Sequence, residues 1–180
     1  MECKTLIITL FLLFMDDIGY SQTESFNNVY FTIPEFSLID IEPNASDIIF
    51  SFDAPTEAGD QLESLSDNTK WLNYTSTVTI GGLLKNITAQ ITNATIIPGL
   101  NIELLVSNYS GRGQGVLGTP VGSINLSTTA QTIITGIGGC FTTTGANSGH
   151  NLEYIVSIND YLVFEVPVTP SINIVFTISN

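Results

Sequence analysis

The sequence predicts an all-β protein, an antiparallel β-sandwich of the immunoglobulin-like or jelly-roll kind with about eight to ten strands. Apolar residues recur at every second position in one short run after another, which is the pattern of strands with one buried face and one face in water. Residues that favour turns, mainly Gly, Pro, Asn and Asp, separate these runs. No stretch keeps helical spacing for more than one turn, so the crossover helices that a parallel sheet needs are missing.

The chain begins with a stretch that predicts a secretory signal peptide at residues 1–21. A lysine precedes the apolar run 5–15, which is shorter than the roughly 20 residues that span a bilayer. Small residues then stand at the positions that a signal peptidase reads, and we expect cleavage between Ser21 and Gln22. The alternative is that these residues form a buried N-terminal strand or helix.

The mature chain follows as an N-terminal segment, residues 22–47, and a β-sandwich domain, residues 48–180. The segment carries two expected strands, at 29–33 and 36–41. Residues 60–68 fit either a short helix or an open loop. The remaining expected strands lie at 48–52, 72–80, 87–91, 102–106, 124–126, 132–137, 152–158 and 172–178.

Composition narrows the range of functions. The chain of 180 residues has a formal net charge of -13 and a hydrophobic fraction of 43%, which is typical of a folded protein rather than a disordered one. So few Lys and Arg residues cannot neutralise a phosphate backbone, so we expect no nucleic-acid partner. No stretch after residue 21 is long and apolar enough to span a membrane. Cys140 is the only cysteine left after cleavage, which excludes an intramolecular disulfide.

One glycine pattern resembles part of a cofactor site. Gly113, Gly115 and Gly118 match the spacing of a dinucleotide-binding turn, in which a helix N-terminus holds the pyrophosphate. Residues 119–122 (TPVG) follow, and they cannot open a long helix. We therefore expect a flexible hairpin loop here and no bound cofactor.

Two further groups of residues, Cys140 with His150 and the acidic residues of 53–67, have side chains that can serve in catalysis or metal binding. Cys140 and His150 could pair as nucleophile and base, but no orienting third group or protease-like signature accompanies them. Cys140 is therefore expected to be a small buried hydrophobic residue with an unpaired thiol. The acidic residues of 53–67 lack the spacing of a calcium-binding EF-hand loop and are expected to be solvated. The sequence predicts a protein that is not an enzyme and that holds no metal.

Three residues are candidates for ligand binding. Trp71 and Tyr109 could offer flat apolar faces to a glycan. The alternative for Trp71, which begins its predicted strand, is an aromatic residue of the core or of its rim. Arg112, the one arginine of the mature chain, stands at the tip of the glycine-rich segment. Tyr74 has the parity of the buried face of its strand, so we expect it in the core.

Several stretches together resemble small secreted proteins of Bacteroidetes bacteria and, more loosely, pilin-type sandwich domains, including the spore-coat-U-like group. The resemblance covers about residues 48–180, and its motifs are strands and turns, so it implies a fold and no catalytic residue. It implies a protein of the periplasm or outer surface of a Gram-negative bacterium. Chaperone–usher pilins often carry a disulfide, which this chain cannot form within itself. The stretches are WLNYTS (71–76), IPGL (97–100), GRGQG (111–115), STTAQTIITGI (127–137), GHNLEY (149–154) and IVFTI (174–178).

These observations predict a secreted or surface-displayed structural or adhesive protein, such as a pilin-like fibre subunit. The alternative is a carbohydrate-binding module that uses Trp71 or Tyr109. A partner would be another copy, another surface protein that meets a strand edge, or a glycan. Residues 29–33 alternate as a donated strand would, and the alternative is that they form the first strand of their own domain.

Overall fold

The computed structural model describes residues 24–92, 97–165 and 171–180. The chain divides into two units, Met1–Ile33 and Pro34–Asn180, and each is described by itself. In the first unit, residues 24–33 form no strand or helix, and every one of them is exposed to solvent. The predicted signal peptide and its cleavage site between Ser21 and Gln22 lie outside the described residues.

The second unit is all-β, as predicted, and every strand pair is antiparallel. The described residues contain no helix. Among them there is therefore no helix long and apolar enough to span a bilayer. The nine strands are β1 (Ser37–Glu42), β2 (Leu65–Ser76), β3 (Lys85–Thr92), β4 (Leu100–Val106), β5 (Gln114–Pro120), β6 (Ser123–Asn125), β7 (Gln131–Phe141), β8 (His150–Ile158) and β9 (Asn173–Ser179).

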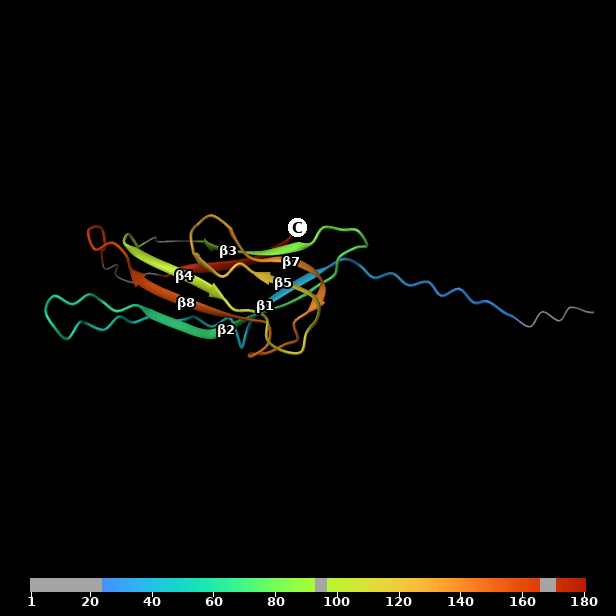
Figure 1. Ribbon diagram of the computed structural model, residues 1–180, viewed down its shortest axis with the longest axis horizontal. Coiled ribbons are helices and arrows are strands. Elements are labelled where there is room, and N and C mark those ends of the chain that lie inside the picture. The colour runs from blue at the N-terminus through green and yellow to red at the C-terminus, as the bar shows by residue number, and fades with distance from the viewer. Residues whose placement is uncertain (1–23, 93–96, 166–170) are drawn as a thin grey trace, which may run out of the picture. The chain divides into compact units, whose positions relative to one another are not determined.

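Hydrogen bonds connect all nine strands into one continuous sheet. Its order is β6-β4-β8-β2-β7-β3-β9, with β1 added to β2 and β5 added to β7. Figure 1 shows β4, β8 and β2 side by side in this order. The long strand β2 joins the two halves, because Leu65–Leu72 pair with β8 whereas Thr75 and Ser76 pair with β7. A division into the two stacked layers of a sandwich stays a prediction.

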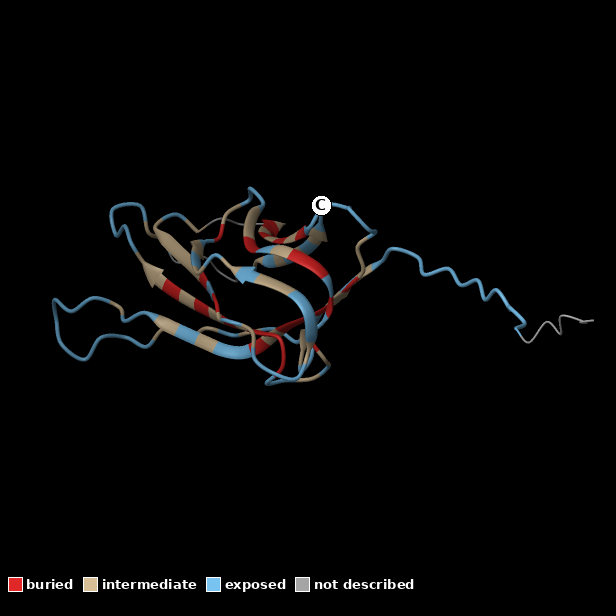
Figure 2. Cartoon of the chain, turned by 45° about the vertical axis from the view of Figure 1, so that its right-hand side comes forward, coloured by how far each residue is buried: buried red, intermediate tan, exposed pale blue. Residues whose placement is uncertain are grey.

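Alternating side chains from both halves of the sheet bury one common core. Along β3, and along β8 as far as Ser157, buried residues alternate with half-buried ones. Figure 2 shows such alternation as red and tan bands along strands. Ile87 of β3 and Ile137 of β7 belong to the same cluster as Leu104 of β4 and Leu152 of β8. Tyr74 is also in this cluster, as its parity predicts. The period-two pattern is therefore the physical origin of the core.

Two buried lysines fix the ends of β1. The Lys85 ammonium lies 3.1 Å from a carboxylate oxygen of Glu35 and donates to the Ser37 hydroxyl at 2.8 Å. The Lys70 ammonium donates to the Asn44 backbone carbonyl at 3.1 Å. Two of the few cations of an acidic chain therefore hold one strand in place instead of meeting solvent.

Two predictions of secondary structure are wrong. Residues 29–33 form no strand. Residues 48–52 show the expected alternation of burial, with Ile48 and Phe50 packed on the core, but they form no backbone ladder. Residues 60–68, expected as a short helix or an open loop, are a loop as far as residue 64, and residues 65–68 belong to β2. Alternation of side chains identifies a half-buried extended segment, whereas a strand also needs a backbone partner.

The glycine-rich segment predicted as a flexible loop is strand β5 from Gln114 onward. Its glycines are needed for close packing against β7 rather than for mobility. A Cβ atom added to Gly115 would lie 2.1 Å from the Gly139 carbonyl oxygen, and one added to Gly118 would lie 2.7 Å from the Thr135 carbonyl oxygen. Both residues also have positive φ angles, of 97° and 78°, that side chains with a Cβ rarely adopt.

Candidate functional site

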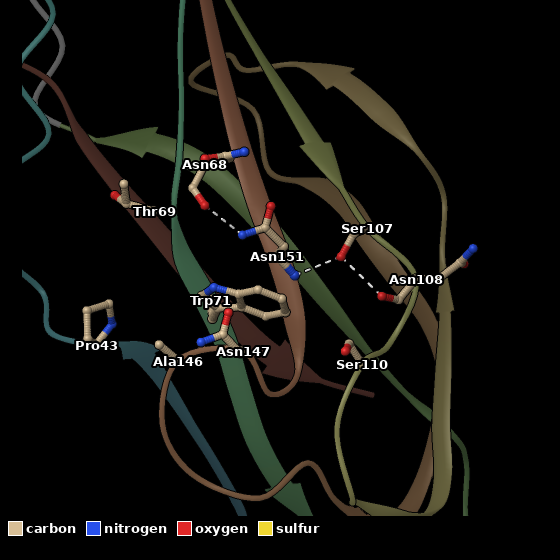
Figure 3. A pocket seen from close by; sticks show the side chains of 10 residues that line it. All are labelled: Pro43, Asn68, Thr69, Trp71, Ser107, Asn108, Ser110, Ala146, Asn147 and Asn151. Carbon is tan, nitrogen blue, oxygen red and sulfur yellow. Dashed lines mark hydrogen bonds between the residues drawn. The ribbon is translucent and has the colours of Figure 1, made fainter.

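The second unit carries an open hollow of about 690 Å³ on its surface. This volume falls within the roughly 300–1,000 Å³ range of small-molecule sites. Figure 3 shows its lining, which comes from segments far apart in the sequence. The lining residues are Pro43, Asn68, Thr69, Trp71, Ser107, Asn108, Ser110, Ala146, Asn147 and Asn151.

The floor of the hollow is formed by two strand residues that face each other across β2 and β8. Trp71 and Asn151 are register partners in this pair, and each precedes a leucine that is fully buried in the core. Side chains alternate along a strand, so both floor residues lie on the outer face. The Asn151 amide nitrogen donates to the backbone carbonyls of Asn68 at 2.7 Å and Lys70 at 3.1 Å. These bonds fix the orientation of the amide.

A bulge in β2 supplies the edge of the floor. The pairing with β8 shifts register between Asp67 and Lys70, so Asn68 and Thr69 leave the regular ladder. A carboxylate oxygen of Asp67 accepts hydrogen bonds from the Thr69 backbone nitrogen at 3.0 Å and from its hydroxyl at 2.8 Å. Bulges of this kind redirect side chains, and they are common next to functional sites.

One wall is the loop between β7 and β8, which presents Ala146 and Asn147. The Gly145 backbone nitrogen donates to a carboxylate oxygen of Glu42 at 3.2 Å, and the Asn73 amide nitrogen donates to the Gly145 carbonyl at 3.0 Å. Asn147 has a φ of 63°, a left-handed conformation that asparagine tolerates better than most residues. The loop is therefore held against β1 and β2, with Asn147 in a defined position.

The opposite wall is residues 107–110, which follow β4. The Ser107 backbone nitrogen donates to the Asn151 carbonyl at 3.0 Å, and its hydroxyl accepts from the Asn151 backbone nitrogen at 2.8 Å. Ser110 and Gly149 exchange a pair of backbone hydrogen bonds of 2.9 and 2.8 Å. These bonds join the two walls at the base of the hollow.

Behind the hollow lies a buried cluster around His150. Its side chain is 0% exposed. The Nδ1 atom is 2.8 Å from the Ser107 carbonyl oxygen, which can only accept, so Nδ1 carries a hydrogen. The Nε2 atom is 2.9 Å from the Tyr74 hydroxyl, and the two rings are stacked. Burial lowers the pKa of His150, so the neutral imidazole is favoured.

The structure does not assemble Cys140 and His150 into a nucleophile and base. Both ring nitrogens of His150 are bonded to Ser107 and Tyr74. Cys140 is buried, as predicted, and its burial raises the pKa of the thiol, which disfavours the thiolate that a nucleophile requires. Within the described parts of the chain, no three His, Cys, Asp or Glu residues are placed to hold a metal ion together.

Of the three predicted ligand-binding residues, the hollow contains Trp71. The Tyr109 hydroxyl accepts a hydrogen bond from the Gly113 backbone nitrogen and donates to the Thr142 carbonyl, and its ring packs edge-on against His150. Tyr109 is therefore half-buried and held in place by the interior, and a ligand-binding role for it stays a prediction. Arg112 is exposed and does not belong to the lining. A ligand-binding role for Arg112 stays a prediction.

The asparagines of the lining carry no signal in the sequence. They come from a bulge, a strand and two connecting segments, and no short spacing relates them. Only the fold brings them to one place. Trp71 is the exception, because its neighbours Lys70 and Leu72 in the strand are buried and its own side chain therefore points outward.

The fold and this surface hollow define an antiparallel all-β protein with an uncharged candidate binding site. Comparison of the chain with protein-family models, curated proteins and solved structures finds no match.

Proposed function

We propose that the protein is a secreted or surface-displayed structural or adhesive subunit, and that copies associate when residues 24–33 of one add a strand to the sheet of the next. The observation that carries this proposal is the exposed apolar character of these residues. Five large side chains among them, Phe26, Val29, Tyr30, Phe31 and Ile33, are each between 71% and 89% exposed. A contiguous apolar stretch of this kind on a soluble protein marks an interaction site.

The pattern of this segment is that of a strand without a partner. Val29, Phe31 and Ile33 alternate with polar or amphipathic residues, so an extended chain would place all three on one face. The segment forms no strand in the described structure. A strand from another chain gains main-chain hydrogen bonds from a sheet edge and specificity from alternate side chains.

The strand β9 offers an edge of matching chemistry. Among the described residues it pairs with β3 alone. Ile174, Phe176 and Ile178 pack against the core, but each stays only partly buried. An added strand that points three apolar side chains to the same face would cover them further.

The energetics predict a weak contact between two isolated copies. Full burial of the three donor side chains contributes about 5–9 kcal/mol, at 1.5–3 kcal/mol each. Association costs roughly 4–15 kcal/mol before the ordering of the segment is counted. Binding should therefore become visible only at high protein concentration or where many copies lie on one surface.

Export is the second part of the proposal. Residues 1–21 have the features of a secretory signal peptide, and a mature chain that begins at Gln22 would place residues 24–33 at its free end. A chain end that is not paired with its own sheet can reach a neighbouring copy without unfolding that sheet. Mass spectrometry of the secreted fraction should find Gln22 as the first residue, and an intact Met1 there would contradict export by cleavage.

The assembly is tested by removing residues 22–33. Size-exclusion chromatography with light scattering should show concentration-dependent association of the mature chain and a monomer for the truncated one, with nearly equal melting temperatures. A sharp fall in the melting temperature of the truncated chain would show that the segment belongs to its own fold. A monomer at every concentration, with and without the segment, would contradict strand addition.

A matched pair of substitutions tests the face of the strand. Phe31→Asp places a charge on the apolar face and should abolish association. Tyr30→Asp places the same charge one residue away, on the other face, and should retain most of it. Equal loss in both variants would indicate a general effect of charge and would contradict pairing of an ordered strand.

A further inference from the structure

We propose that the hollow around Trp71 binds a neutral oligosaccharide. This inference goes beyond the assembly proposed above and does not depend on it, because all lining residues lie within Pro34–Asn180.

The charge of the site excludes most other ligand classes. No lining residue is charged, although the whole chain has a net charge of -13. The acidic neighbours Glu42 and Asp67 accept hydrogen bonds from the protein itself. An anionic ligand such as a nucleotide would find no cation here, and a cationic ligand would find no carboxylate. The hollow therefore suits a ligand that is polar but uncharged.

The lining offers partners for both the apolar C–H face and the hydroxyl groups of a sugar ring. The indole of Trp71 offers a flat apolar face of the kind that packs against the C–H face of a pyranose. Asparagine amides and serine hydroxyls both donate and accept hydrogen bonds, as sugar hydroxyls do. The side-chain amides of Asn108 and Asn147 form no hydrogen bond with any other described residue, so they are available to a ligand.

The site is also preorganised. Hydrogen bonds fix the floor residue Asn151, the wall at Ser107 and the loop that carries Asn147. A ligand then binds without ordering these groups first, which lowers the entropic cost of association. Figure 3 labels Trp71 and Asn147 among the residues that line the hollow.

The chain contains a single tryptophan, so its fluorescence reports directly on the hollow. The purified protein is first screened on an array of neutral and acidic glycans, and the neutral hits are then titrated as free oligosaccharides. We expect a saturable change of Trp71 emission with at least one neutral oligosaccharide and none with hexagalacturonate. No saturable change with any neutral glycan overturns the proposal, as does equal binding of the acidic one.

Variants assign the binding to the hollow, with isothermal titration calorimetry as the readout. Trp71→Phe and Asn147→Gly should each weaken binding by about tenfold, equivalent to about 1.4 kcal/mol. Glycine keeps the left-handed backbone of residue 147 without strain, so the loss would come from the amide. The control Asn159→Gly, at an exposed asparagine outside the lining, should bind as wild type. Unchanged binding in both hollow variants, with circular dichroism showing an intact fold, overturns the assignment.

Discussion

Gly149 at the base of the hollow gives the sharpest test of the described geometry. It has a φ of +84°, and a Cβ atom added there would lie 2.2 Å from both the Leu72 carbonyl oxygen and the Asn73 side-chain oxygen. Gly145 in the same loop has a φ of +92°, but an added Cβ atom would meet nothing within 4 Å. Alanine therefore causes the same kind of backbone strain at both positions, but only at position 149 does it also collide with β2.

The expected magnitudes follow from these distances. Both variants incur roughly 1–2 kcal/mol for a left-handed residue with a side chain. In Gly149→Ala the loop must also move away from β2, which breaks the backbone pair with Ser110. At about 0.5–1.5 kcal/mol for each of the two bonds, the total loss becomes about 2–5 kcal/mol. With a shift of about 2–4 °C per kcal/mol, the melting temperature should fall by about 4–20 °C for Gly149→Ala and about 2–8 °C for Gly145→Ala.

Thermal unfolding followed by circular dichroism measures the difference, and urea unfolding checks it as a free energy. Trp71 emission in the folded state should shift to longer wavelength in Gly149→Ala only, because displacement of this wall would expose more of the half-buried indole to water. Equal destabilisation by the two variants, with no change in emission, would refute the packing of this loop against β2. The geometry of the hollow would then be wrong as well.

Three other predictions concern buried polar groups. Burial lowers the pKa of His150 below its ordinary 6.5, so its contribution to stability is full above that pH and is lost as the pH falls. Urea unfolding should therefore show a free energy of unfolding that falls with pH near pH 6, and His150→Gln should remove this dependence. Lys70→Met should change stability by less than about 1 kcal/mol, because the methionine fills the same space without a buried charge and the exposed oxygens of residues 44–46 can bind water. Lys70→Ala should cost more, by about 2 kcal/mol, in the same melting experiment. Cys140→Ala should cost about 1–2 kcal/mol, and loss of an oligomer in this variant under non-reducing conditions would reveal an intermolecular disulfide instead.

The sequence predicts the regular part of the fold because side-chain periodicity determines which face of a strand is buried. The pattern predicts strands at 87–91 and 152–158, and both lie in strands where burial alternates, as far as Ser157 in the second. Strand β5 could not be found in this way, because Gly115 and Gly118 interrupt the pattern where the backbone of β7 comes close. Residues 29–33 show the converse, since their alternation is regular but they form no strand.

The hollow was predictable only at Trp71. Its walls are connecting segments whose positions depend on long-range hydrogen bonds, such as the one between Gly145 and Glu42 across 103 residues of sequence. Local spacing carries no information about contacts of this kind. The sequence offers His150 only as a base for Cys140, whereas its hydrogen bonds to Ser107 and Tyr74 give it a structural role beneath the hollow.

Charge separates the two proposed interactions. Lys70 and Lys85 are buried, so Arg112 is the one exposed cation among the described residues, and two copies of the chain repel each other. The Debye length falls from about 10 Å at 0.1 M salt to about 3 Å at 1 M, which screens this repulsion. Association through residues 24–33 should therefore strengthen as salt is added, whereas binding of a neutral sugar to an uncharged hollow should stay constant. Association that weakens with salt would mean that ion pairs join the copies, and the apolar strand would then not be the contact.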